Sequence, residues 1–117
     1  MEITRLKPSI FLNTLLSPES QIEIKTAGIS LVDRSWQILE RTLPDHLIYF
    51  IASGTMEAAL NKNFLKLKEG NLLWVQPGVT QKFWLNQNQL ETKVFFVRFH
   101  LKLNNNFIGM ENQYSIM

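Results

Sequence analysis

The sequence predicts an all-β fold, a sandwich or a barrel, built from roughly eight short strands. Two observations lead to this prediction. Short segments rich in apolar residues, several with alternating polarity, recur between turn residues, and the middle of the chain shows no convincing helical periodicity. With 117 residues, of which 45% are hydrophobic, the chain is long enough for one domain with a sizeable core.

The first strands are expected between residues 21 and 53. Alternation over 21–27 predicts a strand that ends before Gly28, and 30–41 is expected to be broadly extended. A turn follows at 42–45, because Pro44 fixes its own φ and disfavours helix at the residue before it. The nearly continuous apolar run over 46–53 is typical of a strand buried on both faces.

The remaining strands alternate with turns up to residue 102. Segments 56–60 and 64–68 flank the polar loop Asn61-Lys62-Asn63 and predict a β-hairpin. Further strands are expected over 72–76, 79–85 and 92–102. The glycines are isolated and no helix is expected after any of them, so we interpret all five as turn residues and not as phosphate cradles: Gly28, Gly54, Gly70, Gly78 and Gly109.

We divide the chain into an N-terminal arm (1–20), a barrel (21–103) and a polar tail (104–117). The arm is expected to be either a mobile segment or an ordinary frayed terminus. Asn104-Asn105-Asn106 begins the tail, for which we predict no regular structure.

Composition excludes several classes of function. The sequence has no cysteine, which excludes disulfides, thiolate metal sites and cysteine nucleophiles. The net charge is only +2, and many lysines of the basic second half alternate with apolar residues, which favours a solvated strand face over a phosphate-binding track. No apolar stretch approaches the ~20 residues of a membrane span, and no secretion leader is recognisable, so we expect a cytoplasmic protein without a membrane partner.

Catalytic and metal-binding patterns are weak. The nucleophile elbow Gly-x-Ser-x-Gly is absent, and the only imidazoles are His46 and His100, expected at the surface and near a strand end. Two distant histidines do not supply the three or four convergent ligands of a metal site. We therefore expect no catalytic residues, no metal and no cofactor, and a protein that is not an enzyme.

Residues 70–81 resemble the second motif of the cupin superfamily. Gly70 and Gly78 fit the motif, whereas Gln76 stands where proline is usual and Gln81 stands where the metal-binding histidine would be. The ligand positions of the first motif fall on Leu43, Pro44 or Leu47 and their neighbours. The resemblance implies a double-stranded β-helix, a jelly-roll-like barrel, that is metal-free.

A narrower resemblance covers residues 34–102. The stretch 41–56, followed by 67–73, 77–79 and 96–99, is similar to the amino-terminal domain of AraC-type transcriptional regulators. This resemblance implies an effector-sensing and dimerisation barrel that forms a homodimer and controls DNA binding by a separate helix-turn-helix domain. That domain, and most of the dimer interface, would lie beyond Met117. The alternatives are a stand-alone cupin binding or scaffold protein and a metal-dependent cupin enzyme.

The same resemblance, with strand alternation, suggests which residues line an effector pocket. Gln81 and Leu47 take inward positions of the motif, and Val94 and Phe96 match positions that contact sugar in the arabinose-responsive member. Apolar walls would leave sugar hydroxyls unpaired, so we predict an apolar or aromatic small-molecule effector; the alternative is a filled barrel without a ligand. The candidates are Arg41, Leu47, Tyr49, Gln81, Phe83, Val94, Phe96 and Arg98.

Overall fold

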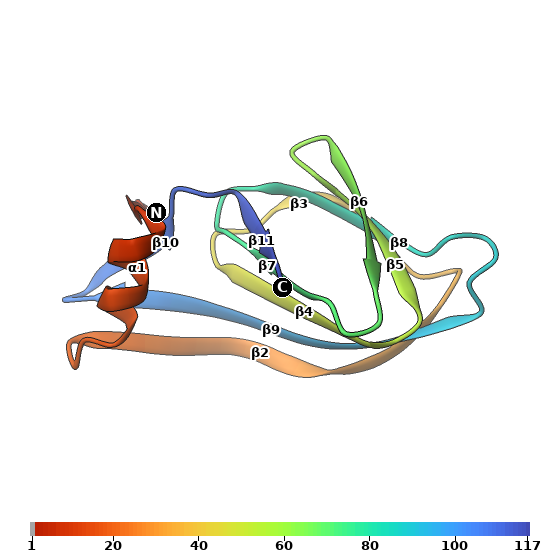
Figure 1. Ribbon diagram of the computed structural model, residues 1–117, viewed down its shortest axis with the longest axis horizontal. Coiled ribbons are helices and arrows are strands. Elements are labelled where there is room, and N and C mark those ends of the chain that lie inside the picture. The colour runs from red at the N-terminus through yellow and green to blue at the C-terminus, as the bar shows by residue number, and fades with distance from the viewer. Residues whose placement is uncertain (1) are drawn as a thin grey trace.

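The computed structural model describes residues 2–117 and consists of two facing β-sheets with one short helix (Figure 1). The seven-stranded sheet has the order β1-β10-β9-β4-β7-β11, with β2 also paired to β9, and the four-stranded sheet has the order β3-β8-β5-β6. The elements are β1 (Thr4–Leu6), α1 (Pro8–Leu15), β2 (Ser20–Asp33), β3 (Gln37–Thr42), β4 (His46–Ser53), β5 (Thr55–Leu60), β6 (Asn63–Lys68), β7 (Leu72–Val75), β8 (Thr80–Trp84), β9 (Glu91–Leu103), β10 (Asn106–Met110) and β11 (Tyr114–Ile116). Among these residues no helix is long and apolar enough to cross a membrane.

The main hydrophobic core lies between the two sheets, because alternate residues of the facing strands point inward. In β5, for example, Met56, Ala58 and Leu60 are fully buried while their neighbours are partly exposed. Phe83 of β8 and Ile51 of β4 meet them in the same core. Figure 1 shows this barrel at one end of the molecule, with β2 and β9 extending side by side along its whole length.

The expected β-hairpin and central strands are confirmed. β5 and β6 pair around a tight turn in which Asn61 (φ 47°) and Lys62 (φ 69°) adopt left-handed conformations. β4, β7, β8 and β9 also lie where the sequence placed them, with ends differing by one or two residues.

The N-terminal arm contains regular structure, for which the sequence analysis assigned no element. β1 pairs in parallel with β10, and α1 inserts Phe11 into a second core. Local signals for α1 are weak, because Lys7 makes no side-chain cap and only Pro8 marks the first turn. Tertiary packing of Phe11 against β9 and β10 therefore stabilises a helix that local signals do not predict.

The polar tail also forms regular structure, to which the sequence analysis assigned no element. Asn104 (φ 50°) and Asn105 (φ 67°) make a two-residue turn that pairs β10 with the end of β9. β11 then pairs with β7. Gln76, at the position where the cupin motif usually has proline, accepts a 2.8 Å hydrogen bond from the backbone N–H of Met110 and so ties β10 to the barrel.

Two glycines lie inside strands, contrary to the prediction that all five are turn residues. Gly54, Gly70 and Gly78 have positive φ and do lie in turns, whereas Gly28 and Gly109 belong to β2 and β10. β2 continues through Gly28, which pairs with Phe96 of β9, and a Cβ at Gly28 would lie only 3.1 Å from Cζ of that ring. The glycine makes room for an aromatic ring and does not end the strand.

Candidate ligand-binding site

A pocket of about 250 Å³ lies at the inner face of the seven-stranded sheet, beside β3. Its walls follow from strand register: Tyr49 of β4 lies opposite Phe96 of β9, and Gly28 of β2 faces Phe96 from the other side. Alternation then turns the second neighbours of these residues toward the same space. The lining residues are Thr26, Ser30, Trp36, Ile38, Arg41, Leu47, Tyr49, Val94, Phe96 and Arg98.

Arg98 is already neutralised within the chain. Its Nε and Nη2 atoms each donate a 3.0 Å hydrogen bond to the carboxylate of Asp45, whose side chain is fully buried. Such a bidentate pair fixes the guanidinium in place. Arg98 therefore contributes shape and a screened charge to the pocket, and its hydrogen-bonding capacity is largely used.

Arg41 is in a different state. Its Nε donates a 3.2 Å hydrogen bond to Oε1 of Gln81, and across residues 2–117 its guanidinium forms no ion pair. The side chain is half-buried, so this cation is only partly hydrated. Burial raises the pKa of the neighbouring Tyr49, and the Arg41 cation opposes that rise only in part. Tyr49 thus keeps its proton and can donate a hydrogen bond near Arg41.

Six of the eight candidates from the sequence line this pocket, and Gln81 and Phe83 lie behind its wall. Gln81 holds Arg41 as described, and the ring of Phe83 packs edge-on against Tyr49 with centroids 4.8 Å apart. These two are therefore buried supports of lining residues. Whether the lining residues bind an effector stays a prediction.

Sequence reasoning missed the contributions of β2, of the turn that follows it and of the start of β3. The missed lining residues are Thr26, Ser30, Trp36 and Ile38. The expected end of the strand before Gly28 removed Ser30 from consideration. A usable signal was present in the small or polar side chains at every second position from Thr26 to Ser30, which is the pattern of a strand lining a cavity.

The residues at the cupin metal position do not fit a metal ion. The amide oxygen of Gln81, at the position where the motif has its histidine, already accepts a hydrogen bond from the Arg41 cation. The other positions implied by the motif hold Leu43, Pro44 and Leu47, which offer no ligand atom on their side chains. In the part of the chain that the structure describes, no three His, Asp or Glu side chains lie close enough together to hold a metal.

His46 is buried, which corrects its expected place at the surface. It lies on the opposite face of β4 from the pocket, where Trp74 Nε1 donates a 3.0 Å hydrogen bond to its Nδ1. Nδ1 is thus an acceptor, and Nε2 donates to the carbonyl of Ile108 at 2.9 Å. Burial lowers the pKa of His46 to about 4, so the ring is neutral near pH 7. His46 joins β4, β7 and β10, and has no part in the pocket.

The chain matches no protein-family model and no curated protein. It is similar in structure to YhaK from Escherichia coli (TM-score 0.64, 13% identity, 82% of this chain and 42% of that one). It is also similar to an RmlC-like cupin protein from Methanocaldococcus jannaschii (TM-score 0.55, 17% identity, 84% of this chain and 89% of that one). A third similar structure is the salicylate 1,2-dioxygenase from Pseudoaminobacter salicylatoxidans in complex with gentisate (TM-score 0.55, 10% identity, 87% of this chain and 39% of that one).

These similarities confirm the predicted all-β, double-stranded β-helix fold of the cupins. The chain spans less than half the length of YhaK and of the dioxygenase. The three neighbours include an enzyme, and none is described as an AraC-type regulator.

Proposed function

We propose that this chain is a ligand-binding cupin barrel whose pocket takes a small apolar or aromatic carboxylate. The observation that carries this proposal is the contrast between the two pocket arginines. Arg98 is neutralised by Asp45, whereas Arg41 forms no ion pair within residues 2–117. A carboxylate beside Arg41 would supply the missing countercharge in a partly desolvated site, where such charge-assisted hydrogen bonds are strong.

The walls of the pocket favour an apolar body on that acid. Trp36, Ile38, Val94 and Phe96 present apolar surface, and the volume of the pocket is slightly below the range typical of ligand sites. A volume of about 250 Å³ suits a ligand the size of a single ring. Most hydroxyls of a sugar would lose water there without gaining a partner, which opposes sugar binding.

A thermal-shift and calorimetry panel tests this proposal. Benzoate and gentisate are the acids, benzyl alcohol is the uncharged ring, and arabinose is the sugar. We expect the two acids to raise the melting temperature of the protein and to bind at one site, with benzyl alcohol at least ~10-fold weaker because it lacks the charge. Stabilisation by arabinose alone, or equal binding of benzoate and benzyl alcohol, contradicts the proposal.

Two matched variants locate the site. Arg41→Gln removes the cation and is expected to lose benzoate binding. Arg34→Gln makes the same change at an exposed arginine in the turn before β3, which donates to the Gln87 carbonyl, and is expected to bind like the wild type. Loss of binding in both variants, or in neither, contradicts a specific role for Arg41.

The finer proposal is that the barrel is the sensor domain of an AraC-type regulator. The similarity of residues 34–102 to that domain supports it. An effector in the pocket would then shift the population between two arrangements of a dimer and alter DNA binding by a separate domain. The mass of the native gene product in source cells tests this proposal: roughly 30 kDa is expected if a DNA-binding domain follows, whereas 13.7 kDa removes the regulator.

The second candidate is a stand-alone cupin that acts by binding. It is favoured by the match to the Methanocaldococcus cupin, which extends over 89% of that chain. Both candidates share the same pocket, and the mass measurement distinguishes them. Metal analysis of the purified protein checks both against a cupin metalloenzyme, since stoichiometric iron, manganese or zinc would contradict both.

A further inference from the structure

The face of β2 that points away from the pocket carries a stripe of exposed apolar side chains. Ser30 faces inward opposite Val94, so its neighbours Ile29 and Leu31 face outward. The pairing of β2 with β9 is irregular next to Lys25, where β2 has one extra residue. Ile22 and Ile24 therefore face outward on the same side as Ile29 and Leu31, although they are even-numbered. The exposed residues of the stripe are Ile22, Ile24, Ile29 and Leu31, each exposed by 59–67%.

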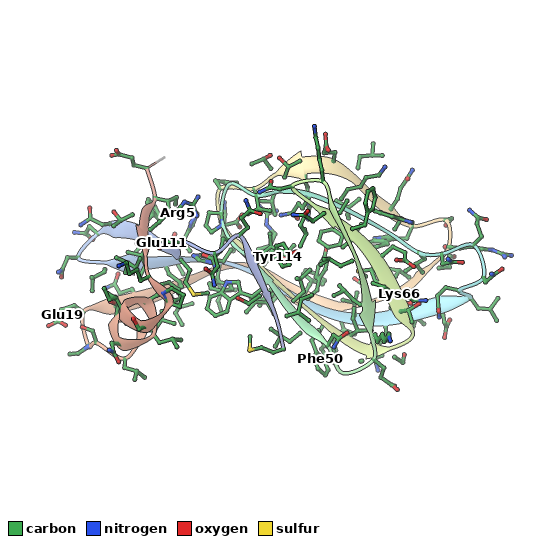
Figure 2. All side chains as sticks on the ribbon, turned by 45° about the horizontal axis from the view of Figure 1, so that its top comes forward. Arg5, Glu19, Phe50, Lys66, Glu111 and Tyr114 are labelled. Atoms are coloured by element: carbon green, nitrogen blue, oxygen red, sulfur yellow. The ribbon has the colours of Figure 1, made fainter. Side chains whose placement is uncertain are left out.

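The stripe continues across the neighbouring strands. Phe95 of β9 lies opposite Ile29 on one side and Phe50 of β4 on the other, and the two phenylalanine rings lie 6.2 Å apart. Together with Ile48 and Val97, they surround a shallow, almost wholly apolar hollow of about 460 Å³. Figure 2 shows Phe50 on the outside of the barrel. We call this surface, from Ile22 to Leu31 on β2 with Phe50 and Phe95, the outer apolar face.

The outer apolar face is large for a monomer. Its six large side chains are 37–67% exposed, which corresponds to roughly 600 Å² of apolar surface, at the upper end of the patches that monomers carry. A standard protein interface buries about 800 Å² on each partner. The face therefore supplies most of the area that one half of a stable dimer needs.

We propose that a second copy of this chain packs on the outer apolar face. A two-fold dimer buries the same patch on both subunits, and a stripe of like apolar side chains is complementary to itself. The charged side chains nearest the stripe on its own face are Asp33 of β2 and Lys93 of β9, which lie at its end beside Leu31, as in interfaces whose centre is depleted of charge. The hollow has no polar anchor of the kind a small-molecule site uses.

The free edge of β2 supports the same conclusion. In the described residues β2 pairs only with β9, so it is a 14-residue edge strand with an exposed apolar face. Proteins that remain monomeric usually cover or charge such an edge. This interface lies within the barrel itself, whereas the AraC resemblance places most of the dimer interface beyond Met117. The inference does not depend on the proposed ligand.

Sedimentation of the full chain without ligand, over a wide range of protein concentration, tests the proposal. We expect reversible association to twice the 13.7 kDa monomer. Ile29→Glu is expected to raise the dissociation constant at least ~10-fold, because the charge would be buried without a partner. The matched control is Leu39→Glu on β3, where the leucine is 67% exposed on the other sheet, and it is expected to dimerise like the wild type.

A second measurement does not require a charge to be placed in the interface. The chain has no cysteine, so Leu31→Cys and Lys62→Cys each give one site for a spin label. We expect a defined intermolecular distance from the label at position 31, within the interface, and a longer distance or none from position 62, in the β5–β6 turn. A monomer at all concentrations contradicts the proposal, as do open-ended assemblies or a dimer broken by Leu39→Glu but kept by Ile29→Glu.

Discussion

The outer face of the seven-stranded sheet, which points away from the four-stranded sheet, is apolar at both ends, and the two ends differ in how they are covered. At one end α1 places Phe11, which is fully buried, over Phe99 and Leu101 of β9. At the other end Phe95 of the same strand is 38% exposed, and its neighbour Ile29 is 59% exposed. The same alternation of β9 supplies both ends, so the difference lies in what covers them.

At the covered end the chain completes its own packing, including the hydrogen bonds of a neutral His46. At the open end, and in the pocket on the inner face, the described part of the chain supplies no such cover. Apolar surface that a chain leaves incompletely covered marks the places where something else binds. In the pocket, the polar anchor Arg41 favours binding of a small acid. The outer apolar face has no such anchor in its hollow, which favours binding of a protein surface there.

The largest expected effect comes from uncovering the closed end. Phe11→Ala should lower the free energy of unfolding by about 3–5 kcal/mol, because it removes a fully buried ring and leaves a cavity. Phe64→Ala is the control, since Phe64 is 77% exposed, and its change should be well under 1 kcal/mol. Urea denaturation measures both. A loss for Phe11→Ala no larger than for Phe64→Ala would show that α1 does not close this end.

The second largest effect is expected from acid, which should lower the free energy of unfolding through His46 at the closed end. The pKa of His46 falls from 6.5 to about 4 on folding, so the unfolded state binds the proton more readily between these values. The stabilisation is therefore present above pH 6.5 and lost as the pH falls toward 4, by about 3 kcal/mol. Urea denaturation at a series of pH values measures it. His46→Gln should remove most of the pH dependence of the unfolding free energy between pH 6.5 and 4, whereas His100→Gln should leave most of that dependence in place. The reverse pattern would contradict the role given to His46.

A smaller effect is expected where β2 meets the pocket. In Gly28→Ala the new Cβ would lie 3.1 Å from Cζ of Phe96, so the ring must shift into the pocket that it lines. We expect a cost of about 1 kcal/mol in stability and benzoate affinity lower by several fold. Ala27→Ser, on the opposite face of the strand, is the control for calorimetry and should bind benzoate normally. Unchanged affinity in Gly28→Ala would remove β2 from the pocket wall.

The smallest effect on folding is expected at the open end. Ile29→Thr keeps a β-branched residue and should change the unfolding free energy of the dilute monomer by less than about 0.5 kcal/mol. Chemical denaturation at the lowest workable concentration measures this change. A loss comparable to that of Phe11→Ala would mean that the chain buries Ile29 itself, and the contrast between the two ends would disappear.

Much of the barrel could be predicted because its signals are local. The hairpin at Asn61 and Lys62 is specified by its turn, and the pocket side chains of β4 and β9 follow from simple alternation. The turn at Asn104 and Asn105 has the same left-handed geometry, but a run of three asparagines does not distinguish a tight turn from the start of a polar tail.

What could not be predicted depends on contacts between distant segments. The burial of Phe11 and His46 requires β10 to return over β9, and no local pattern in the arm indicates that. Alternation from Thr26 to Ser30 indicates a strand that lines a cavity, but it does not show which residues of β9 lie opposite, and that register places both side chains in this pocket.

The three tryptophans allow the most direct test of the central claim that the inner face is a binding site. Trp36 lines the pocket, Trp74 bonds to His46 at the closed end, and Trp84 contacts Phe64 on the other sheet. In a titration with benzoate followed by the indole N–H signals in NMR, the account predicts a saturable shift of Trp36 alone. No shift at Trp36, or equal shifts at Trp74 and Trp84, would contradict it.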